Sequence, residues 1–495
     1  MPLIGFDNSY TRLPERFYAP AAAASASEPF MFAFNEPLAK ELGLDVALLK
    51  REGAALFSGN LKPDDAANVA LAYAGHQFGH FVPQLGDGRA MLLGEVTTPD
   101  GRHVDIQLKG SGPTRFSRNG DGRAALGPVI REYIVSEAMH ALGIPTTRSL
   151  AAVTTGDAVY REQAQPGGVI ARVAASHIRV GTFQYFAARG DEEGVKLLAD
   201  HVISRHYPEL RGEEDRYIRL FEAIAARQAA LIAKWMGVGF IHGVMNTDNM
   251  AISGETIDYG PCAFMDAYSA TKTFSSIDRN RRYAYANQPG IGQWNLARLA
   301  ECLLPLFGDV QEEAMEKANA ALRTYGERFQ AEWLKVMRAK LGLVREREDD
   351  LKLIQSFLSL MEEGEADFTL AFLRLTAAAG GPSADFELAD RELRGEFNAP
   401  DAAQIWLDGW RHYLEGDSIS PEDRKALMQK ANPVYIPRNH RIEETIRAAV
   451  DDGDFSLFEA LNRVLARPYE QQAGFERYKA APLNHEIVPR TFCGT

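Results

Sequence analysis

The sequence predicts an α+β fold in two lobes, a β-rich small lobe followed by an enlarged, mostly helical large lobe. From about residue 68 to 174, short apolar runs alternate with glycine turns, which is the pattern of strands. After about residue 180, apolar residues recur at helical spacing over long stretches. The chain has 495 residues, of which 46% are hydrophobic, so it can bury a core in more than one lobe.

Pattern and composition divide the chain into four parts. An N-terminal extension (1–67) is expected to pack on the body, and it contains the small-residue linker 20–28. The small lobe follows at 68–174 and the helical lobe at 175–467, and a C-terminal tail occupies 468–495.

The small lobe is expected to contain at least four strands and one helix. In the second strand, Val104, Ile106 and Leu108 alternate with polar residues, as in a strand with one buried face. The predicted strands are 90–97, 103–110, 158–163 and 167–173, and the predicted helix is 127–143.

The helical lobe begins with a long amphipathic segment at 213–240. Phe221, Ile224, Leu231 and Trp235 share one face of that helix, and acidic residues suit its N-terminal end. Further helices are predicted at 292–307, 309–341, 348–378 and 401–431.

Charge, hydropathy and cysteine content exclude several classes. A net charge of −13 argues against a nucleic-acid binder, whose surface would be basic. No run approaches eighteen apolar residues and no secretory signal is evident, so we expect a cytoplasmic protein without a membrane partner. The three cysteines form no CxxC pair, which fits a reducing compartment and gives no zinc framework.

Gly86, Gly88 and Arg89 form a candidate phosphate-binding turn before the strand at 90–97. Glycines let backbone N–H groups approach phosphates, and an arginine adds charge. Asp-Gly is also the commonest hairpin signal, so a plain turn is the alternative.

Lys109 projects from the polar face of the next strand, about 20 residues after the glycine turn. In a protein kinase, a strand lysine at this place pairs nucleotide phosphates and a helix glutamate. Glu132 and Glu137 both lie in the following helix, and the spacing favours Glu132. An ordinary solvated lysine is the alternative.

Basic residues gather after this strand, although the chain is acidic. Between 102 and 131 there are six Lys or Arg and two acids. Arginine side chains bind phosphates in a bidentate manner, whereas a solvated basic loop is the simpler explanation. Arg172 and Arg179 follow at the junction of the lobes, where each contacts either a structural acid or a triphosphate.

The stretch IHGVMNTDNMAISGETIDYG (241–260) resembles an altered kinase catalytic loop. His242 and Asn249 keep the spacing of the kinase His-Arg-Asp…Asn motif, and Asp258 stands where the metal-binding Asp-Phe-Gly aspartate belongs. Val244 occupies the position of the kinase base, whereas Asp248 is a new acid that could accept a proton.

We predict that residues 250–258 form a hairpin that brings Asn249 and Asp258 together. Their oxygens would then share a hard divalent cation, Mg²⁺ or Mn²⁺. Turn capping by Asp248 and a strand end at Asp258 are the structural alternatives. His76 and His80 lack a third ligand, so we interpret them as packed histidines and not as a zinc site.

With these motifs, the sequence resembles the selenoprotein O (YdiU) family over nearly its whole length. The matching runs are FDNSYTRLPERFY (6–18), LAYAGHQFGHFVPQLGDGRAMLLGE (71–95), DIQLKGSGPTRFSRNGDGRAALGPVIREY (105–133), RVAASHIRVGTFQYF (172–186), GVMNTDNMAISGETIDYGPCAFMDAY (243–268), NQPGIGQWNLARLA (287–300) and NPVYIPRNHRIEE (432–444).

The resemblance implies a protein-kinase-like fold that holds ATP reversed and transfers AMP to hydroxyl groups of proteins, with UMP from UTP as a second donor. It implies Asp248 as proton acceptor and Asn249 and Asp258 as metal ligands. The implied nucleotide contacts are Gly86, Gly88, Arg89, Lys109, Asp121, Gly122, Arg172, Arg179 and Asp258. Transfer of the γ-phosphate and a silent pseudokinase scaffold remain as alternatives.

Members of this family often carry a reactive Cys or selenocysteine near the C-terminus. Here the tail contains Cys493, and Cys262 is the nearest candidate partner for a regulatory disulfide. Inert thiols are the alternative that we favour.

Overall fold

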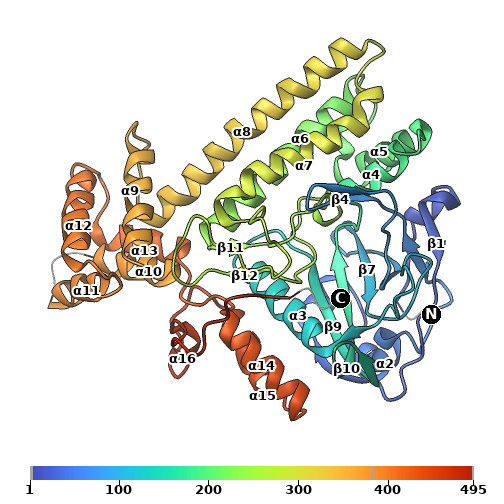
Figure 1. Cartoon of the computed structure of the whole chain (residues 1–495), viewed down its shortest axis with the longest axis horizontal. Helices are drawn as coiled ribbons and strands as arrows, with labels where there is room; N and C mark the ends of the chain where they lie inside the picture. The colour runs from blue at the N-terminus through green and yellow to red at the C-terminus, as the bar shows by residue number, and fades with distance from the viewer. Residues whose placement is uncertain (1–3, 381–383, 493–495) are drawn as a thin grey trace.

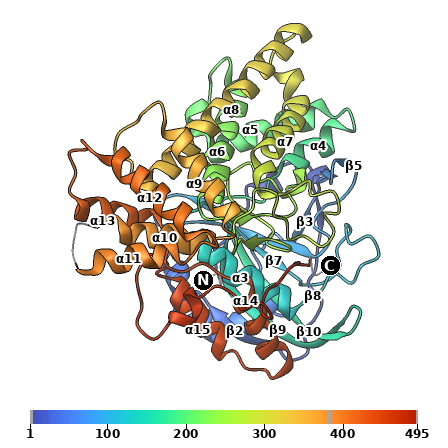
Figure 2. The same ribbon diagram turned by 60° about the vertical axis from the view of Figure 1, so that its left-hand side comes forward.

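The computed structural model describes residues 4–380 and 384–492 (Figures 1 and 2). Its N-terminal half is built on an antiparallel eight-stranded sheet with the order β1-β3-β6-β7-β10-β9-β2, in which β8 pairs with β10. The strands are β1 (Tyr18–Pro20), β2 (Phe30–Phe34), β3 (Val69–Leu71), β6 (Ala90–Thr97), β7 (His103–Lys109), β8 (Ala124–Ala125), β9 (Arg148–Tyr160) and β10 (Ala164–Ala174).

The sheet is covered on both faces. Helices α1 (Glu36–Glu41) and α2 (Val46–Ser58) share a core with Val169 and Ala171 of β10, whereas Ile170 between them packs with α3 (Leu126–Ala141). This alternation places α3 on the opposite face from α1 and α2. The helix predicted at 127–143 therefore exists, one residue earlier at its start.

Two strands follow the sequence pattern closely and one does not. β6 has the predicted bounds, and β7 ends one residue early, at Lys109. The strand predicted at 158–163 is wrong, because β9 begins at Arg148 and residues 161–163 form the turn into β10. The first half of β9 is buried on both faces, so it shows no alternation of polar and apolar residues.

The helical half begins with a group of long helices that lie side by side (Figure 1). Helix α6 buries Phe221, Ile224, Leu231 and Trp235, the face that the sequence predicts. The helices of this group are α4 (Val180–Ala187), α5 (Glu192–His206), α6 (Arg216–Gly237), α7 (Gln288–Leu303) and α8 (Gln311–Leu341).

Apart from α14, α15 and α16, the remaining helices form the end of the molecule opposite the sheet, and α14 and α15 pack on α3 (Figure 1). Two predicted long helices are each divided: Asp367 caps the start of α10, and Ser420 caps the start of α13. The helices are α9 (Asp350–Glu363), α10 (Phe368–Ala378), α11 (Ala384–Arg394), α12 (Pro400–Leu414), α13 (Pro421–Ala431), α14 (Asn439–Asp451), α15 (Ser456–Leu465) and α16 (Glu476–Lys479).

Among the described helices, none combines the length and the apolar character that a membrane span requires.

Candidate active site

The loop that the sequence singles out lies between two short paired strands, β11 (Phe240–Ile241) and β12 (Ala263–Phe264). The hairpin predicted within it is wrong. Ala251 forms a bridge with Arg179 and Thr256 forms one with Thr146, so both sides of the expected hairpin pair with other segments. Asp258 emerges from this loop with a left-handed backbone, φ +66°.

Asp258 is the centre of a buried ion cluster. Its Oδ1 accepts from Lys109 Nζ at 2.8 Å and from Arg172 Nη2 at 2.6 Å, and its Oδ2 accepts from Arg179 Nη1 at 2.8 Å. Burial alone would raise the pKa of Asp258, but the charges of Arg172, Lys109 and Arg179 hold that pKa well below its usual range. Asp258 is therefore ionised at neutral pH.

A second carboxylate completes the cluster from α3. Glu132 Oε2 accepts from Lys109 Nζ at 2.7 Å, and Glu132 Oε1 accepts from Arg172 Nε at 2.8 Å. The other candidate, Glu137, instead binds Arg148. Buried Asp87 lies 3.9 Å from Arg179, so three cations face three carboxylates in the unliganded cluster. An anionic ligand would compete with these carboxylates for the same cations.

Arg179 joins this cluster to the second acid of the loop. Its Nη1 donates to the backbone carbonyl of Asp248 at 2.8 Å as well as to Asp258. Its guanidinium lies over the ring of Tyr73, 4.7 Å from the centroid. One side chain therefore fixes the relative position of Asp248 and Asp258.

Asp248 lies in a 3₁₀ turn, Thr247–Asn249, and its carboxylate is only half satisfied. Gln77 Nε2 donates to Oδ2 at 3.1 Å, while Oδ1 is buried and accepts no hydrogen bond in the described part of the chain. Burial raises the pKa of Asp248 to about 6. An unpartnered carboxylate oxygen is costly in a structural role but suits a group that accepts a proton from a substrate.

The partner of Asp248 comes from a hairpin that sequence reasoning left out of the site. Strands β4 (Gly75–Gln77) and β5 (His80–Val82) pair, and this hairpin lies on the catalytic loop. His76 N donates to Thr247 Oγ1 at 2.6 Å, and Phe78 N donates to Asn246 Oδ1 at 3.1 Å. The sequence signal was present as two glycines, Gly75 and Gly79, one at the start of β4 and one in the turn between β4 and β5.

Asn249 and His242 also orient the loop. Asn249 Nδ2 donates to the carbonyl of Val244 at 3.0 Å, which leaves the amide oxygen for another ligand. His242 Nε2 lies 2.9 Å from the carbonyl of Ile257 and so holds the residue before Asp258. Asn249 and Asp258 offer oxygen donors of the kind Mg²⁺ or Mn²⁺ prefers. The described residues contain no cluster of three His, Cys, Asp or Glu that could hold a metal by itself, so other ligands must come from a substrate or water.

The glycine turn 86–89 is linked to the cluster through Asp87, which the sequence analysis did not select. Asp87 Oδ2 accepts from Gln107 Nε2 at 3.1 Å, and Gln107 in turn accepts from Arg172. A Cβ on Gly86 would lie 2.3 Å from the ring of Phe116, and one on Gly88 would lie 2.9 Å from the Phe116 carbonyl. The glycines therefore let the basic loop pack on the turn. The backbone carbonyl of Arg89 accepts a hydrogen bond from Gly110 N, so Arg89 lies beside the end of β7.

Asp121 is exposed, whereas the next residue, Gly122, is buried. Asp121 pairs with Arg161 at 2.8 Å, which lowers its pKa, and Gly122 has φ +63° and packs on Gly112. Among the described residues, no hydrogen bond or ion pair joins Asp121 or Gly122 to the Asp258 cluster. These two residues therefore lie apart from the rest of the expected nucleotide site.

The C-terminal tail contacts the segment that follows Asp258. Thr491 N donates to the carbonyl of Phe274 at 2.8 Å, and Thr491 Oγ1 donates to the carbonyl of Pro261 at 2.5 Å. Cys262 is buried. Cys493 lies outside the described residues, and with it the disulfide considered above.

Comparisons with known proteins identify the family of this chain. A family model described as protein adenylyltransferase SelO matches residues 3–466. The chain belongs to the SelO family. A protein of Rhizobium etli (strain CIAT 652) named protein nucleotidyltransferase YdiU is 62% identical over 490 residues, 99% of this chain and 97% of the relative. Relatives of the same name from Rhizobium meliloti (strain 1021) and Bradyrhizobium diazoefficiens are 61% and 58% identical, with 100% and 99% of each chain covered.

Proposed function

We propose that this protein transfers AMP from ATP to hydroxyl groups of other proteins, with release of pyrophosphate, and that UTP can serve as a second donor of a nucleotide. The observation that carries the proposal is the pair of acids held by Arg179. One is an ionised carboxylate among cations, Asp258, and the other is a carboxylate with a vacant buried oxygen, Asp248. The family membership narrows the chemistry to nucleotidyl transfer.

We propose the following reaction for this pair of acids. The acceptor hydroxyl gives its proton to the carboxylate of Asp248, and its oxygen forms a bond to the α-phosphorus of ATP. The bond from that phosphorus to the β-phosphate bridging oxygen breaks, and pyrophosphate leaves with the electron pair. Lys109, Arg172 and Arg179 supply positive charge for the phosphates, which compete with Asp258 and Glu132 for the same cations.

We propose Asn249 and Asp258 as the protein ligands of Mg²⁺ or Mn²⁺. A divalent cation bound there would neutralise phosphate charge and orient the α-phosphate. Its charge would also loosen the hold of Asp258 on the three basic side chains, which frees them for phosphate.

We also infer that the two halves of the chain correspond to the lobes of a protein kinase. Three features support this inference: the ion pair of the strand lysine Lys109 with Glu132 of α3, the His242 loop between paired strands, and the metal-site aspartate Asp258 after it. The replacement of the kinase base by Val244 then explains why a different acid serves in the reaction.

The direct test uses ATP labelled at either the α- or the γ-phosphate, with Mg²⁺ or Mn²⁺ and a cell lysate as acceptor. We expect protein-bound label from α-labelled ATP only. Label from γ-labelled ATP alone would identify a phosphotransferase, and no label from either donor, with nucleotide bound, would identify a pseudokinase scaffold. A parallel reaction with α-labelled UTP measures the second donor.

A further inference from the structure

A cavity lies beside the hairpin that contacts the candidate base, and the nucleotide chemistry above does not use it. It has a volume of about 720 Å³, within the usual range of ligand sites. Its walls come from the tip of the β4–β5 hairpin, a loop after β12 and the start of α7. The lining residues are Phe78, Ile277–Asn280, Arg282, Ala286, Asn287, Gly290 and Ile291.

Phe78, at the tip of the β4–β5 hairpin, links this cavity to the catalytic loop. Phe78 places its ring on the cavity wall, and its backbone N–H donates to Asn246 Oδ1 and to the hydroxyl of Tyr283. The preceding residue, Gln77, donates to the carboxylate of Asp248. The cavity therefore lies next to the hairpin that positions the candidate base.

The loop on the other side of the cavity is basic. From 267 to 287 it carries four Lys or Arg and one acid, in a chain with a net charge of −13. The one acid, Asp278, is buried and accepts from the backbone N–H groups of Arg282 and Tyr283, both at 2.9 Å. Its carboxylate is thus engaged by its own loop and does not reach outward as a partner for arginines.

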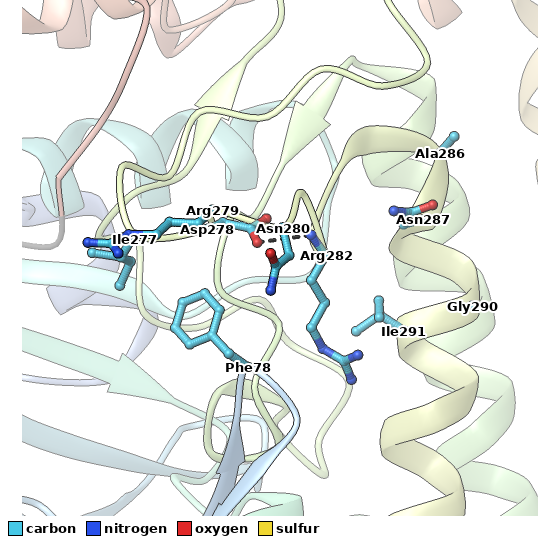
Figure 3. Close-up of a pocket in the computed structure, with 10 residues that line it drawn as sticks. All are labelled: Phe78, Ile277, Asp278, Arg279, Asn280, Arg282, Ala286, Asn287, Gly290 and Ile291. Atoms are coloured by element: carbon cyan, nitrogen blue, oxygen red, sulfur yellow. Dashed lines mark hydrogen bonds between the residues drawn. The ribbon is translucent and has the colours of Figure 1, made fainter.

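The arginines of this loop lack carboxylate partners in the described part of the chain. Arg279 is exposed, and Arg282 lies over the ring of Trp294 at 4.7 Å and against Gly79 of the hairpin tip. Figure 3 shows the Arg282 guanidinium between the Phe78 ring and Ile291 of α7, and the Arg279 side chain extending from the same loop in the other direction. Cations that stand at a cavity without a structural acid attract an external carboxylate.

We propose that this cavity, the acceptor groove, binds the segment of the protein substrate that carries the acceptor hydroxyl, and that it selects acidic residues next to that hydroxyl. The apolar walls from Phe78, Ile277 and Ile291 hold the chain, and Arg279 and Arg282 pair with Asp or Glu. The inference rests on the proposed function for the identity of the reaction, but binding itself requires no chemistry and can be measured alone.

The experiment measures binding of two dye-labelled peptides to the full chain without nucleotide. Both contain one Tyr and one Ser, flanked by Glu in the acidic peptide and by Lys in the other, with the same dye. We expect the acidic peptide to bind at least about tenfold more tightly, and this difference to shrink as salt is added. Equal binding of both peptides would overturn the proposal.

Charge-reversal variants locate the site. Arg279→Glu should weaken binding of the acidic peptide about tenfold and strengthen binding of the lysine peptide. Arg328→Glu on the exposed face of α8 makes the same charge change away from the groove and should leave both affinities unchanged. Equal losses with the two variants would mean that net charge, and not the groove, attracts the peptide.

Two further results separate this proposal from others. If millimolar phosphate displaces the acidic peptide more strongly than chloride of equal ionic strength, the cavity is a small-anion site. The proposal that it binds a protein segment is then wrong. If the acidic peptide binds as expected but no α-label from ATP reaches it or any protein, the groove stands and the proposed function fails.

Discussion

Gly75 lies against the carboxylate of Asp248, so closely that a Cβ on Gly75 would stand 2.5 Å from Oδ1 and 2.9 Å from the Cβ of Asp248. The hairpin that carries Gly75 is about 170 residues away in sequence, and its neighbour Gln77 binds the other oxygen of the same carboxylate. Asp248 can therefore take this position only because residue 75 is a glycine, which has no Cβ.

We therefore expect Gly75→Ala to lower nucleotidyl transfer by about a hundredfold, because the added methyl displaces Asp248 from the acceptor hydroxyl. Thermal unfolding should change much less than activity. Gly326→Ala is the matched control: nothing lies within 4 Å of its Cβ position on α8, so activity should stay unchanged. Equal transfer rates of the Gly75 variant and the wild type would remove Asp248 from the mechanism.

The variant Asp258→Asn tests the metal site. Asn tolerates the left-handed backbone that this position requires, φ +66°, so the loop should keep its path. We expect Mn²⁺ binding in the presence of ATP, followed by electron paramagnetic resonance, to weaken and transfer to fall by about a hundredfold or more. Asp248→Asn should lose transfer but keep Mn²⁺ binding. Unchanged Mn²⁺ affinity of the Asp258 variant would refute the ligand assignment.

Arg172 is 1% exposed and binds both carboxylates of the cluster. Arg172→Met removes one partner of a buried ion pair, so we expect a loss of about 3–5 kcal/mol in the free energy of unfolding. Adding Glu132→Gln should restore part of this loss, because the uncompensated charge is then gone as well. Urea unfolding measures both variants, with Arg328→Met as an exposed control; additive losses in the double variant would contradict the coupling.

Lys340 of α8 is buried against the rings of Phe372 and Phe368, at 4.1 and 5.5 Å from their centroids. Burial lowers the pKa of Lys340 to about 7 in the folded protein, whereas an unfolded lysine titrates near 10.4. Above pH 7 the unfolded chain binds the additional proton, so this residue makes stability rise with pH from about 7 towards 10.

Lys340→Met should therefore be more stable than the wild type at pH 6, and its advantage should shrink by pH 9. Denaturant unfolding at several pH values measures the difference. Lys335→Met, the same change at an exposed position of the same helix, should show no such trend. A constant advantage of the Lys340 variant across this range would mean that the lysine does not lose its proton on burial.

Local patterns in the sequence were sufficient to predict those site residues whose positions are set by their own strand or loop. Alternation located β7 and put Lys109 at its end, and motif spacing selected His242, Asn249 and Asp258. The divisions of two long helices also had local signals, since Asp367 and Ser420 are capping residues and Pro421 is a helix-start residue.

Local sequence patterns could not predict the contacts between segments that are distant in the chain. The hairpin predicted after Asn249 competes with pairing partners at Thr146 and Arg179, which only the folded chain brings near. Gln77 and Gly75 acquire their roles through a contact with Asp248 that no periodicity encodes. The acceptor groove likewise combines a hairpin tip, a loop and a helix start from three parts of the chain.

The place of β2 at the outer edge of the sheet has a consequence for how the protein is made. Met31 pairs with Val153 and Phe30 with Thr154, so β2 is synthesised long before β9 exists to receive it. During that interval its unpaired backbone groups are open to other chains. Because such distant pairing also slows folding, the newly made chain depends on protection from self-association until β9 has emerged.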